Sequence, residues 1–148
     1  MLSAPMSPSR FALRSDRVLV DRALRPAVVV VEDARIADVL APAAIDASSP
    51  LPVIDLEGVL LPGLVDSHVH MNEPGRTEWE GFETATAAAA SGGVTTLVDM
   101  PLNCIPVTTS AAALDEKMRA IGSILEVDVG LWGGVVPWLY VNQTSFLT

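Results

Sequence analysis

Hydrophobic and polar positions follow two different patterns along the 148 residues of this chain. Residues 17–61 contain short runs rich in Val and Ile that are punctuated by Pro: RVLV, AVVVVED, ARIADVL and VIDLEGVLL. Such runs favour β structure over helix, because β-branched side chains suit a pleated surface and Pro marks strand boundaries. We therefore expect a small β domain at residues 11–59, preceded by a disordered leader at residues 1–10.

From residue 60 onward the pattern changes to apolar runs of strand length separated by helical stretches. The runs are LLPGLVDSHVH, VTTLVDMP and EVDVGLWGGVV. Strand, helix, strand, helix, strand is the βαβ alternation, in which parallel strands are buried on both faces and so lack polar alternation. We predict a βαβαβ unit at residues 60–136.

Both helices of this unit carry local signals. The first is expected from Thr77 to Ala90, because Thr77 and Glu80 fit a capping box and Gly92-Gly93 follows as a stop. The second is expected from about Thr109 to Gly122. Its apolar face should contain Leu114, Met118 and Ile121, which recur at helical spacing.

Composition narrows the classes of function. A net charge of -9 argues against a nucleic-acid partner, which needs clustered Lys and Arg. The uncharged residues 129–148 contain Gly133, Gly134 and Pro137, which argue against a membrane span. The single cysteine, Cys104, excludes an intrachain disulfide and is expected to be a small buried side chain. We expect a cytoplasmic protein, with an organelle as the alternative because the leader faintly suggests a transit peptide.

The two histidines of the chain, His68 and His70, stand two residues apart at the end of an apolar run. Side chains two apart on a strand share a face, so the two imidazoles could hold one metal ion. In parallel α/β folds the active site lies at the carboxyl ends of the strands, which is where these histidines stand. Two hydrogen-bonded loop histidines are an equally plausible interpretation.

Polar residues near the predicted strand ends are further candidates. Asp66 could orient an imidazole or could simply make a strand-end hydrogen bond. Asn72, Asp99 and Asn103 stand where substrate contacts cluster, although Asn and Asp also form turns. Arg76 could hold a substrate but is expected to be solvated.

Two aromatic residues of the same stretch have a simpler expected role. Trp79 and Phe82 fall inside the predicted first helix. We expect both to pack on a face of that helix, because large aromatic side chains dominate the energetics of cores.

Residues 61–109, with HVHMNEPGRTEWEGFET and VDMPLN, closely resemble the allantoinases, cyclic-amide hydrolases of the metal-dependent amidohydrolase superfamily. The resemblance implies a (β/α)8 barrel, here its first three strands and two helices, behind the N-terminal part of a small β-sandwich. It also implies two bridged metal ions, usually zinc, and opening of the hydantoin ring of allantoin to allantoate in purine and urate breakdown. The family pattern makes His68 and His70 metal ligands and places Asn103 and Asn72 near the substrate. A homo-oligomer, a homotetramer in the family, is also implied.

The same resemblance predicts that this chain lacks part of the catalytic machinery. The family's carboxylated lysine, two later histidines and proton-shuttling aspartate have no counterpart, and Lys117, on the predicted second helix, cannot be the bridging lysine. After Pro137 the sequence departs from the family pattern, so we expect residues 138–148 to be an aberrant tail behind the barrel start at residues 60–137. We therefore expect an N-terminal piece that is inactive alone.

Two alternatives stay open. One is a non-enzymatic module that pairs with a full-length subunit through unpaired strand edges. The other is a dihydroorotase or hydantoinase type of cyclic amidase. The dihydroorotases typically carry Arg where this chain has Asn72, and the hydantoinases lack the NEPGRTEWEGF signature.

Overall fold

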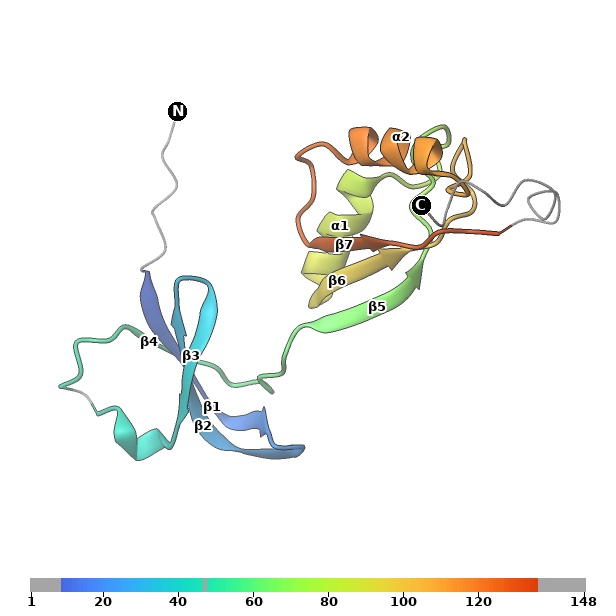
Figure 1. Cartoon of the computed structure of the whole chain (residues 1–148). Coiled ribbons are helices and arrows are strands. Elements are labelled where there is room, and N and C mark those ends of the chain that lie inside the picture. The colour runs from blue at the N-terminus through green and yellow to red at the C-terminus, as the bar shows by residue number, and fades with distance from the viewer. Residues whose placement is uncertain (1–8, 47, 136–148) are drawn as a thin grey trace. The chain divides into compact units, whose positions relative to one another are not determined.

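The computed structural model (Figure 1) describes residues 9–46 and 48–135, which form two compact units that divide between Pro62 and Gly63. The expected domain boundary, between residues 59 and 60, lies three residues earlier. Of the expected leader, only Ser9 and Arg10 are described, and Arg10 already begins the first strand. The expected tail at residues 138–148 lies outside the described residues.

The first unit is one four-stranded sheet. Its elements are β1 (Arg10–Val20), β2 (Ala23–Glu32), β3 (Arg35–Leu40), the short 3-10 helix η1 (Pro42–Ala44) and β4 (Val53–Asp55). The strand order is β3-β2-β1-β4, with antiparallel β3-β2 and β2-β1 pairs and a parallel β1-β4 pair. The predicted β character of this region is confirmed, and β1 begins seven residues before the RVLV run.

Burial in the first unit is centred on β2. Ala27, Val28, Val29 and Val30 are all buried, which explains the unbroken apolar run in this inner strand. Val28 and Val30 belong to one core cluster and Ala27 and Val29 to another, as expected when alternate side chains point to opposite faces. Both faces of the sheet therefore carry apolar packing.

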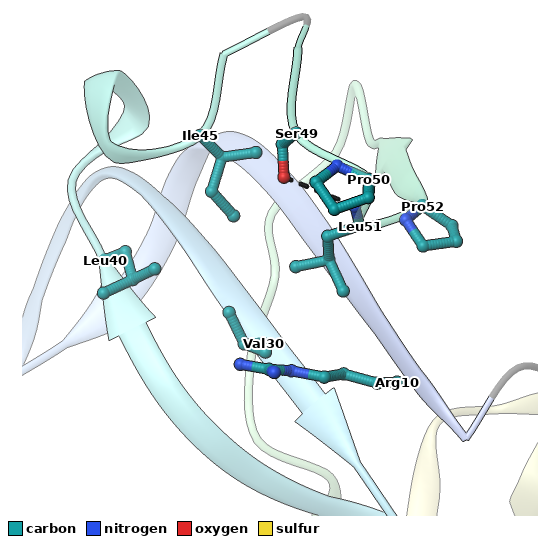
Figure 2. Close-up of a pocket in the computed structure, with 8 residues that line it drawn as sticks. All are labelled: Arg10, Val30, Leu40, Ile45, Ser49, Pro50, Leu51 and Pro52. Carbon is teal, nitrogen blue, oxygen red and sulfur yellow. Dashed lines mark hydrogen bonds between the residues drawn. The ribbon is translucent and has the colours of Figure 1, made fainter.

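A cavity of about 460 Å³ opens in this first unit beside one of the two clusters (Figure 2). Its walls are formed by residues of the three strands β1, β2 and β3 and of the segment between β3 and β4: Arg10, Val30, Leu40, Ile45, Ser49, Pro50, Leu51 and Pro52. Ser49 Oγ accepts a hydrogen bond from the backbone N–H of Leu51 at 3.3 Å. The cavity contains neither of the two histidines.

The second unit is a parallel α/β layer. It contains β5 (Leu64–Val69), α1 (Phe82–Ser91), β6 (Val94–Asp99), α2 (Ala111–Ile121) and β7 (Asp128–Leu131). The strands lie in the order β5-β6-β7 and all pairs are parallel, so the predicted βαβαβ unit is confirmed.

Both helices lie on one side of this sheet (Figure 1). Phe82 of α1, Ile121 of α2 and Leu97 of β6 share one buried cluster with Met71. The expectation that all three strands are buried on both faces is wrong: in β5, Leu64 is 53% and Val65 is 65% exposed, and no residue of β7 is buried. The reason is that among the described residues β5 pairs only with β6 and carries little packing of its own.

The predicted start of the first helix is also wrong. α1 begins at Phe82 with Gly81 as its N-cap, and no side-chain cap hydrogen bond comes from Gly81. Thr77 and Glu80 precede the helix and form no capping box. Instead, the carboxylate of Glu73 accepts a hydrogen bond from the backbone N–H of Phe82 at 3.0 Å. The cap therefore comes from a loop residue that the local pattern does not mark.

α2 begins close to the predicted position but buries a different face. Ser110 is its N-cap, and the Ser110 hydroxyl accepts from the N–H of Ala113 at 3.2 Å. The buried residues are Ala113, Lys117 and Ile121, while Met118 is 55% exposed, so the predicted place of Met118 on the packed face is wrong. The helix is rotated so that its only lysine points inward.

No helix among residues 9–46 and 48–135 is long and apolar enough to cross a membrane.

Candidate metal and substrate site

The candidate residues gather at the carboxyl ends of β5 and β6. His68 is the second-to-last residue of β5, and His70 follows the strand directly. Asp99 is the last residue of β6, and Asn103 follows in the next loop. Two loops, residues 70–81 and 100–110, thus carry most of the candidates, because parallel strands end at the same edge of a sheet.

The two imidazoles lie next to each other. Their ring centroids are 5.6 Å apart, with the ring planes at 67°. His68 is exposed and His70 is half-buried. His70 Nδ1 is buried and has no hydrogen-bond partner within the described residues. A buried polar atom without a partner is uncommon and calls for an explanation, such as an ion bound there.

Asp66 makes a local contact. Its Oδ1 accepts a hydrogen bond from the backbone N–H of His68 at 3.0 Å. The side chain therefore supports the strand end beside the first histidine. Among the described residues, Asp66 accepts no hydrogen bond from an imidazole N–H, which was the other role that we considered for it.

Asn72 is buried and closes the loop that follows the histidines. Its N–H donates to Glu80 O at 2.9 Å, and its own carbonyl accepts from the N–H of Arg76 at 3.0 Å. Its side-chain Oδ1 is buried without a hydrogen-bond partner among the described residues. The backbone of Asn72 is thus held by two hydrogen bonds, while its side-chain Oδ1 is an acceptor without a partner in the described residues.

Asn103 and Arg76 connect the two loops. A guanidinium nitrogen of Arg76 donates to the carbonyl of Asn103 at 3.2 Å, and Asn103 has a positive φ of 72°. The same guanidinium lies 4.7 Å from the ring centroid of Trp79. Arg76 is therefore held between two partners, and Trp79, which is 61% exposed and precedes α1, is not the packed helix residue that we predicted. Phe82 is fully buried, as expected.

Backbone contacts also join the two loops. The N–H of Ile105 donates to Pro74 O at 2.8 Å. Gly75 lies so close that a Cβ built on it would stand 2.6 Å from Ile105 Cβ and 2.8 Å from Ile105 O. Gly75 also has a φ of 92°, which favours glycine. The loop after β5 therefore rests directly on the loop after β6.

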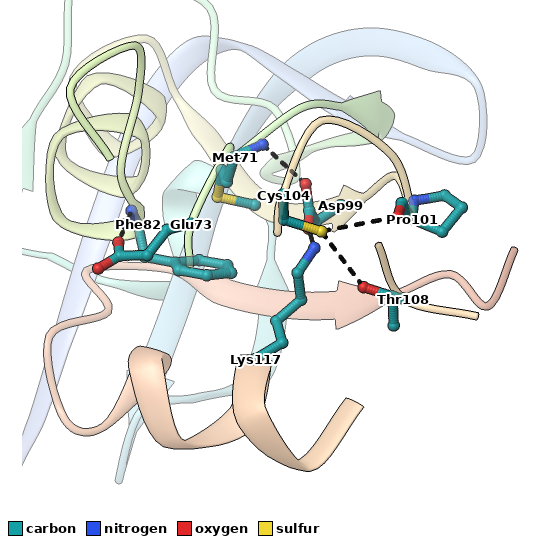
Figure 3. A network of polar contacts seen from close by, with 8 residues as sticks. All are labelled: Met71, Glu73, Phe82, Asp99, Pro101, Cys104, Thr108 and Lys117. Carbon is teal, nitrogen blue, oxygen red and sulfur yellow. Dashed lines mark hydrogen bonds and ion pairs between the residues drawn. The ribbon is translucent and has the colours of Figure 1, made fainter. Parts of the chain in front are cut away.

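The carboxylate of Asp99 is a buried charged group at this edge of the sheet (Figure 3). Its side chain is fully buried, accepts from the Met71 N–H at 2.7 Å and forms an ion pair with Lys117, which is 1% exposed. Burial raises the pKa of the Asp99 carboxyl above its ordinary value, while hydrogen bonds from Lys117 and from the Met71 N–H, together with the charges of Lys117 and His70, oppose that rise.

Cys104 is buried, as expected, and its Sγ lies 3.6 Å from both Pro101 O and Thr108 Oγ1 (Figure 3). These contacts are those of a packed thiol with weak hydrogen bonds.

Sequence reasoning missed the Asp99–Lys117 pair and the cap supplied by Glu73. Lys117 follows Ala113 by four residues and precedes Ile121 by four, so it belongs to the same helix face as two apolar residues. That spacing is the signal that could have placed the lysine inside. The Glu73 cap had no such signal, because its partner Phe82 is nine residues away.

The residues present fit part of a metal centre. Two neighbouring imidazoles, one with an unpartnered buried nitrogen, are suitable nitrogen donors for zinc. In the part of the chain that the structure describes, no group of three or more His, Cys, Asp and Glu residues lies together to hold an ion. A catalytic zinc site usually needs about three protein ligands, so the histidines supply only part of one.

A parallel α/β unit with paired histidines at the carboxyl end of its first strand fits the start of a barrel fold whose functional site lies at that end of the strands. Residues 59–140 match the model of the amidohydrolase family. This match covers more than half of the chain, which therefore belongs to the amidohydrolase family, a family that is generally metal-dependent.

The chain is similar to proteins called allantoinase. It is 50% identical to the Streptomyces avermitilis allantoinase over 133 residues, which cover 89% of this chain and 30% of that protein. It is also 50% identical to the Saccharomyces cerevisiae allantoinase over 135 residues, which cover 85% of this chain and 29% of that protein. The chain thus spans about a third of the length of these curated relatives.

Among solved structures, the chain is similar to the L-hydantoinase from Arthrobacter aurescens. The two share 32% identity with a TM-score of 0.68, over 86% of this chain and 28% of that chain. The predicted fold class, the start of a (β/α)8 barrel behind part of a β-sandwich, is confirmed by this likeness and by the family match.

Proposed function

We propose that this chain serves the hydrolysis of allantoin to allantoate, as the first part of a metal-dependent cyclic-amide hydrolase of purine breakdown. The observation that carries the proposal is the pair of neighbouring imidazoles at the carboxyl end of β5, in a chain half identical to two proteins called allantoinase. The metal is zinc, with two ions in the complete site.

Each candidate residue has a definite task in this proposal. His68 and His70 bind metal, and His70 does so through a ring that is already half-buried. Bound metal supplies Lewis acidity toward the ring carbonyl and lowers the pKa of water. Asn72 and Asn103 contact the polar ring, Asn72 through the Oδ1 that has no hydrogen-bond partner among the described residues.

A chimera tests the proposal. Residues 11–135 of this chain replace the matching segment of the Streptomyces avermitilis allantoinase, and allantoate formation is measured. We expect turnover in the chimera and its loss when His68 or His70 is changed to Asn. A folded, zinc-loaded chimera without turnover would contradict the proposal.

The chain alone is expected to give no turnover, because its two histidines cannot complete a site of about three protein ligands. Allantoate formation at an ordinary enzyme rate by the purified chain with zinc would contradict this expectation. The same chimera, offered hydantoin or dihydroorotate, separates allantoinase from the two related cyclic amidases. Preference for either of those rings would favour the alternative.

A second candidate function is that of a module that pairs with another subunit. It is favoured by the outer edges of β5 and β7, which have no strand partner in the described ranges, and by exposed apolar side chains such as Leu64 and Val65. Unpaired edges are templates for strand addition. Size-exclusion chromatography of the chain, alone and with a full-length allantoinase, tests this candidate function. A monodisperse monomer that does not associate with the enzyme would contradict it.

Assembly and location complete the proposal. We propose a homo-oligomer acting in the cytoplasm, with an organelle as the alternative in a eukaryote; one relative, 45% identical over 127 residues, is called "Allantoinase, mitochondrial". Imaging of a tagged chain in its own cells would distinguish the two compartments.

A further inference from the structure

The buried ion pair between Asp99 and Lys117 has no task in the function proposed above, although it lies beside the candidate metal ligands. Both side chains are almost fully removed from water, at 0% and 1% exposure. The desolvation of each ion costs on the order of several kcal/mol. A protein with an apolar pair of similar volume in place of the ions is often as stable. Stability alone is therefore a weak reason for a charged pair at this place.

The geometry of the pair suggests a different reason. One oxygen of Asp99 accepts from the Met71 N–H at 2.7 Å, and the other faces Lys117 Nζ. The carboxylate thus joins the end of β6, the chain that leaves β5, and α2 (Figure 3). Met71 follows His70 directly, and the peptide group between them is planar. Fixing the Met71 nitrogen therefore also fixes the carbonyl group of His70.

The ring of His70 needs such support. In most metal sites the second ring nitrogen of a histidine donates to a carboxylate or a carbonyl, which sets the direction of the ring. Among the described residues, no hydrogen bond supports the His70 ring from a carboxylate or a carbonyl, and its buried Nδ1 has no partner. The hydrogen bond from the Met71 N–H to Asp99 restrains the backbone that directly follows His70.

We propose that Asp99, held in place by Lys117, is a positioning residue that sets the backbone at His70 and so aims this imidazole at the metal. Lys117 pairs with one oxygen of the buried carboxylate and leaves the other turned toward Met71, where it accepts from the amide. The inference rests on the metal site proposed above. Its test is therefore designed so that failure of the positioning role can be distinguished from failure of the metal site.

Two double variants isolate the hydrogen bond from the charges. Asp99→Asn with Lys117→Met removes both charges but keeps an oxygen that can accept from Met71. Asp99→Leu with Lys117→Met keeps the number and branching of the side-chain heavy atoms at position 99 but has no acceptor. With both charges removed from each variant, the comparison tests the acceptor of the Met71 N–H. Should the second variant not fold, Asp99→Val with Lys117→Met replaces it, because Val suits a strand and also lacks an acceptor.

The first measurement needs no metal. Amide hydrogen exchange of Met71 is compared with that of Leu97, which lies in β6. We expect Met71 to exchange at least about tenfold faster in the variant without an acceptor, with Leu97 unchanged and with normal Met71 protection in the Asn variant. Equal Met71 protection in both variants, or equal loss at Met71 and Leu97, would overturn the proposal.

The second measurement is Co²⁺ affinity of the 148-residue chain, read from the visible spectrum of the bound ion. The Asn variant should bind as the unmodified chain does, and the Leu variant about tenfold or more weakly. Equal affinity in both variants would overturn the positioning role. If the unmodified chain binds no Co²⁺, the metal site proposal fails, and the exchange data still decide whether Asp99 fixes the Met71 amide.

Discussion

The carboxylate of Glu73 accepts a hydrogen bond at 3.0 Å from the backbone N–H of Phe82, nine residues further along the chain. Phe82 is the first residue of α1 and is fully buried in the core of the second unit. Glu73 thus takes the place of the N-cap side chain that Gly81 lacks. Negative charge at a helix N-terminus is also favoured by the helix dipole. The loop that follows the histidines is therefore fastened to the start of the first barrel helix.

Replacing Glu73 tests this cap. Glu73→Ala should lower the free energy of unfolding by about 1 kcal/mol, because a helix N–H loses its acceptor. Glu73→Gln should lose much less, since an amide oxygen still accepts. Thr77→Ala is the matched control and should change little, because Thr77 forms no cap. Urea unfolding followed by circular dichroism measures all three, and an equal loss in Thr77→Ala would contradict the assignment.

Gly75 is expected to tolerate no side chain. Gly75→Ala would place a methyl group against Ile105 in a backbone conformation with φ of 92°, at a cost of about 1–3 kcal/mol in the free energy of unfolding. Gly92→Ala is the control, because there a Cβ would make only ordinary contacts at 3.5 Å. Denaturant unfolding compares them. The assignment of Gly75 as the contact point of the two loops is wrong if both variants lose the same stability.

The pair Arg14–Asp55 predicts a pH dependence in the first unit. Two hydrogen bonds, at 2.6 and 3.0 Å, and the charge of the guanidinium hold the pKa of the Asp55 carboxyl below 3.8. At a pH just below 3.8, the folded state therefore binds fewer protons than the unfolded chain. The contribution of the pair is present above pH 3.8 and is lost as the pH falls through the lowered pKa.

Arg14→Gln should therefore raise the pKa of Asp55 toward 3.8 and make the acid-side loss of stability shallower. Carboxyl NMR titration measures the pKa, and unfolding at several pH values measures the stability. Asp46 is an internal control, because its pKa is lowered mainly by hydrogen bonds from the hydroxyl and N–H of Ser48. An Asp55 pKa unchanged by the substitution would rule out Arg14 as the cause.

Zinc binding by the chain should depend on both histidines. His68→Asn and His70→Asn are each expected to lower zinc affinity at least about tenfold, because each removes one of two nitrogen donors. Asp66→Asn is the control on the same strand and should leave affinity unchanged, since its oxygen can still accept from the His68 N–H. Competition with a chromogenic chelator at fixed pH measures affinity. Similar losses in all three variants would indicate damage to β5 instead.

Much of the fold follows from local patterns in the sequence. The Val-rich runs predict the strands of the first unit, and the alternation after residue 60 predicts β5 to β7 with two helices. The sequence motifs also locate the histidines at a strand end, and the structure brings their rings together at 5.6 Å. These features depend on side-chain periodicity and on residue type, which can be recognised without knowing the packing.

Other features depended on contacts between residues far apart in the chain. The sequence by itself determined the class of fold and the position of His68 and His70 on it. Only the tertiary structure decided that α1 starts at Phe82, that Lys117 turns inward to Asp99, and that Arg76 reaches the carbonyl of Asn103. The physical reason is that a buried charge or an uncapped helix end is satisfied by whichever partner the fold brings near, and local sequence does not specify that partner.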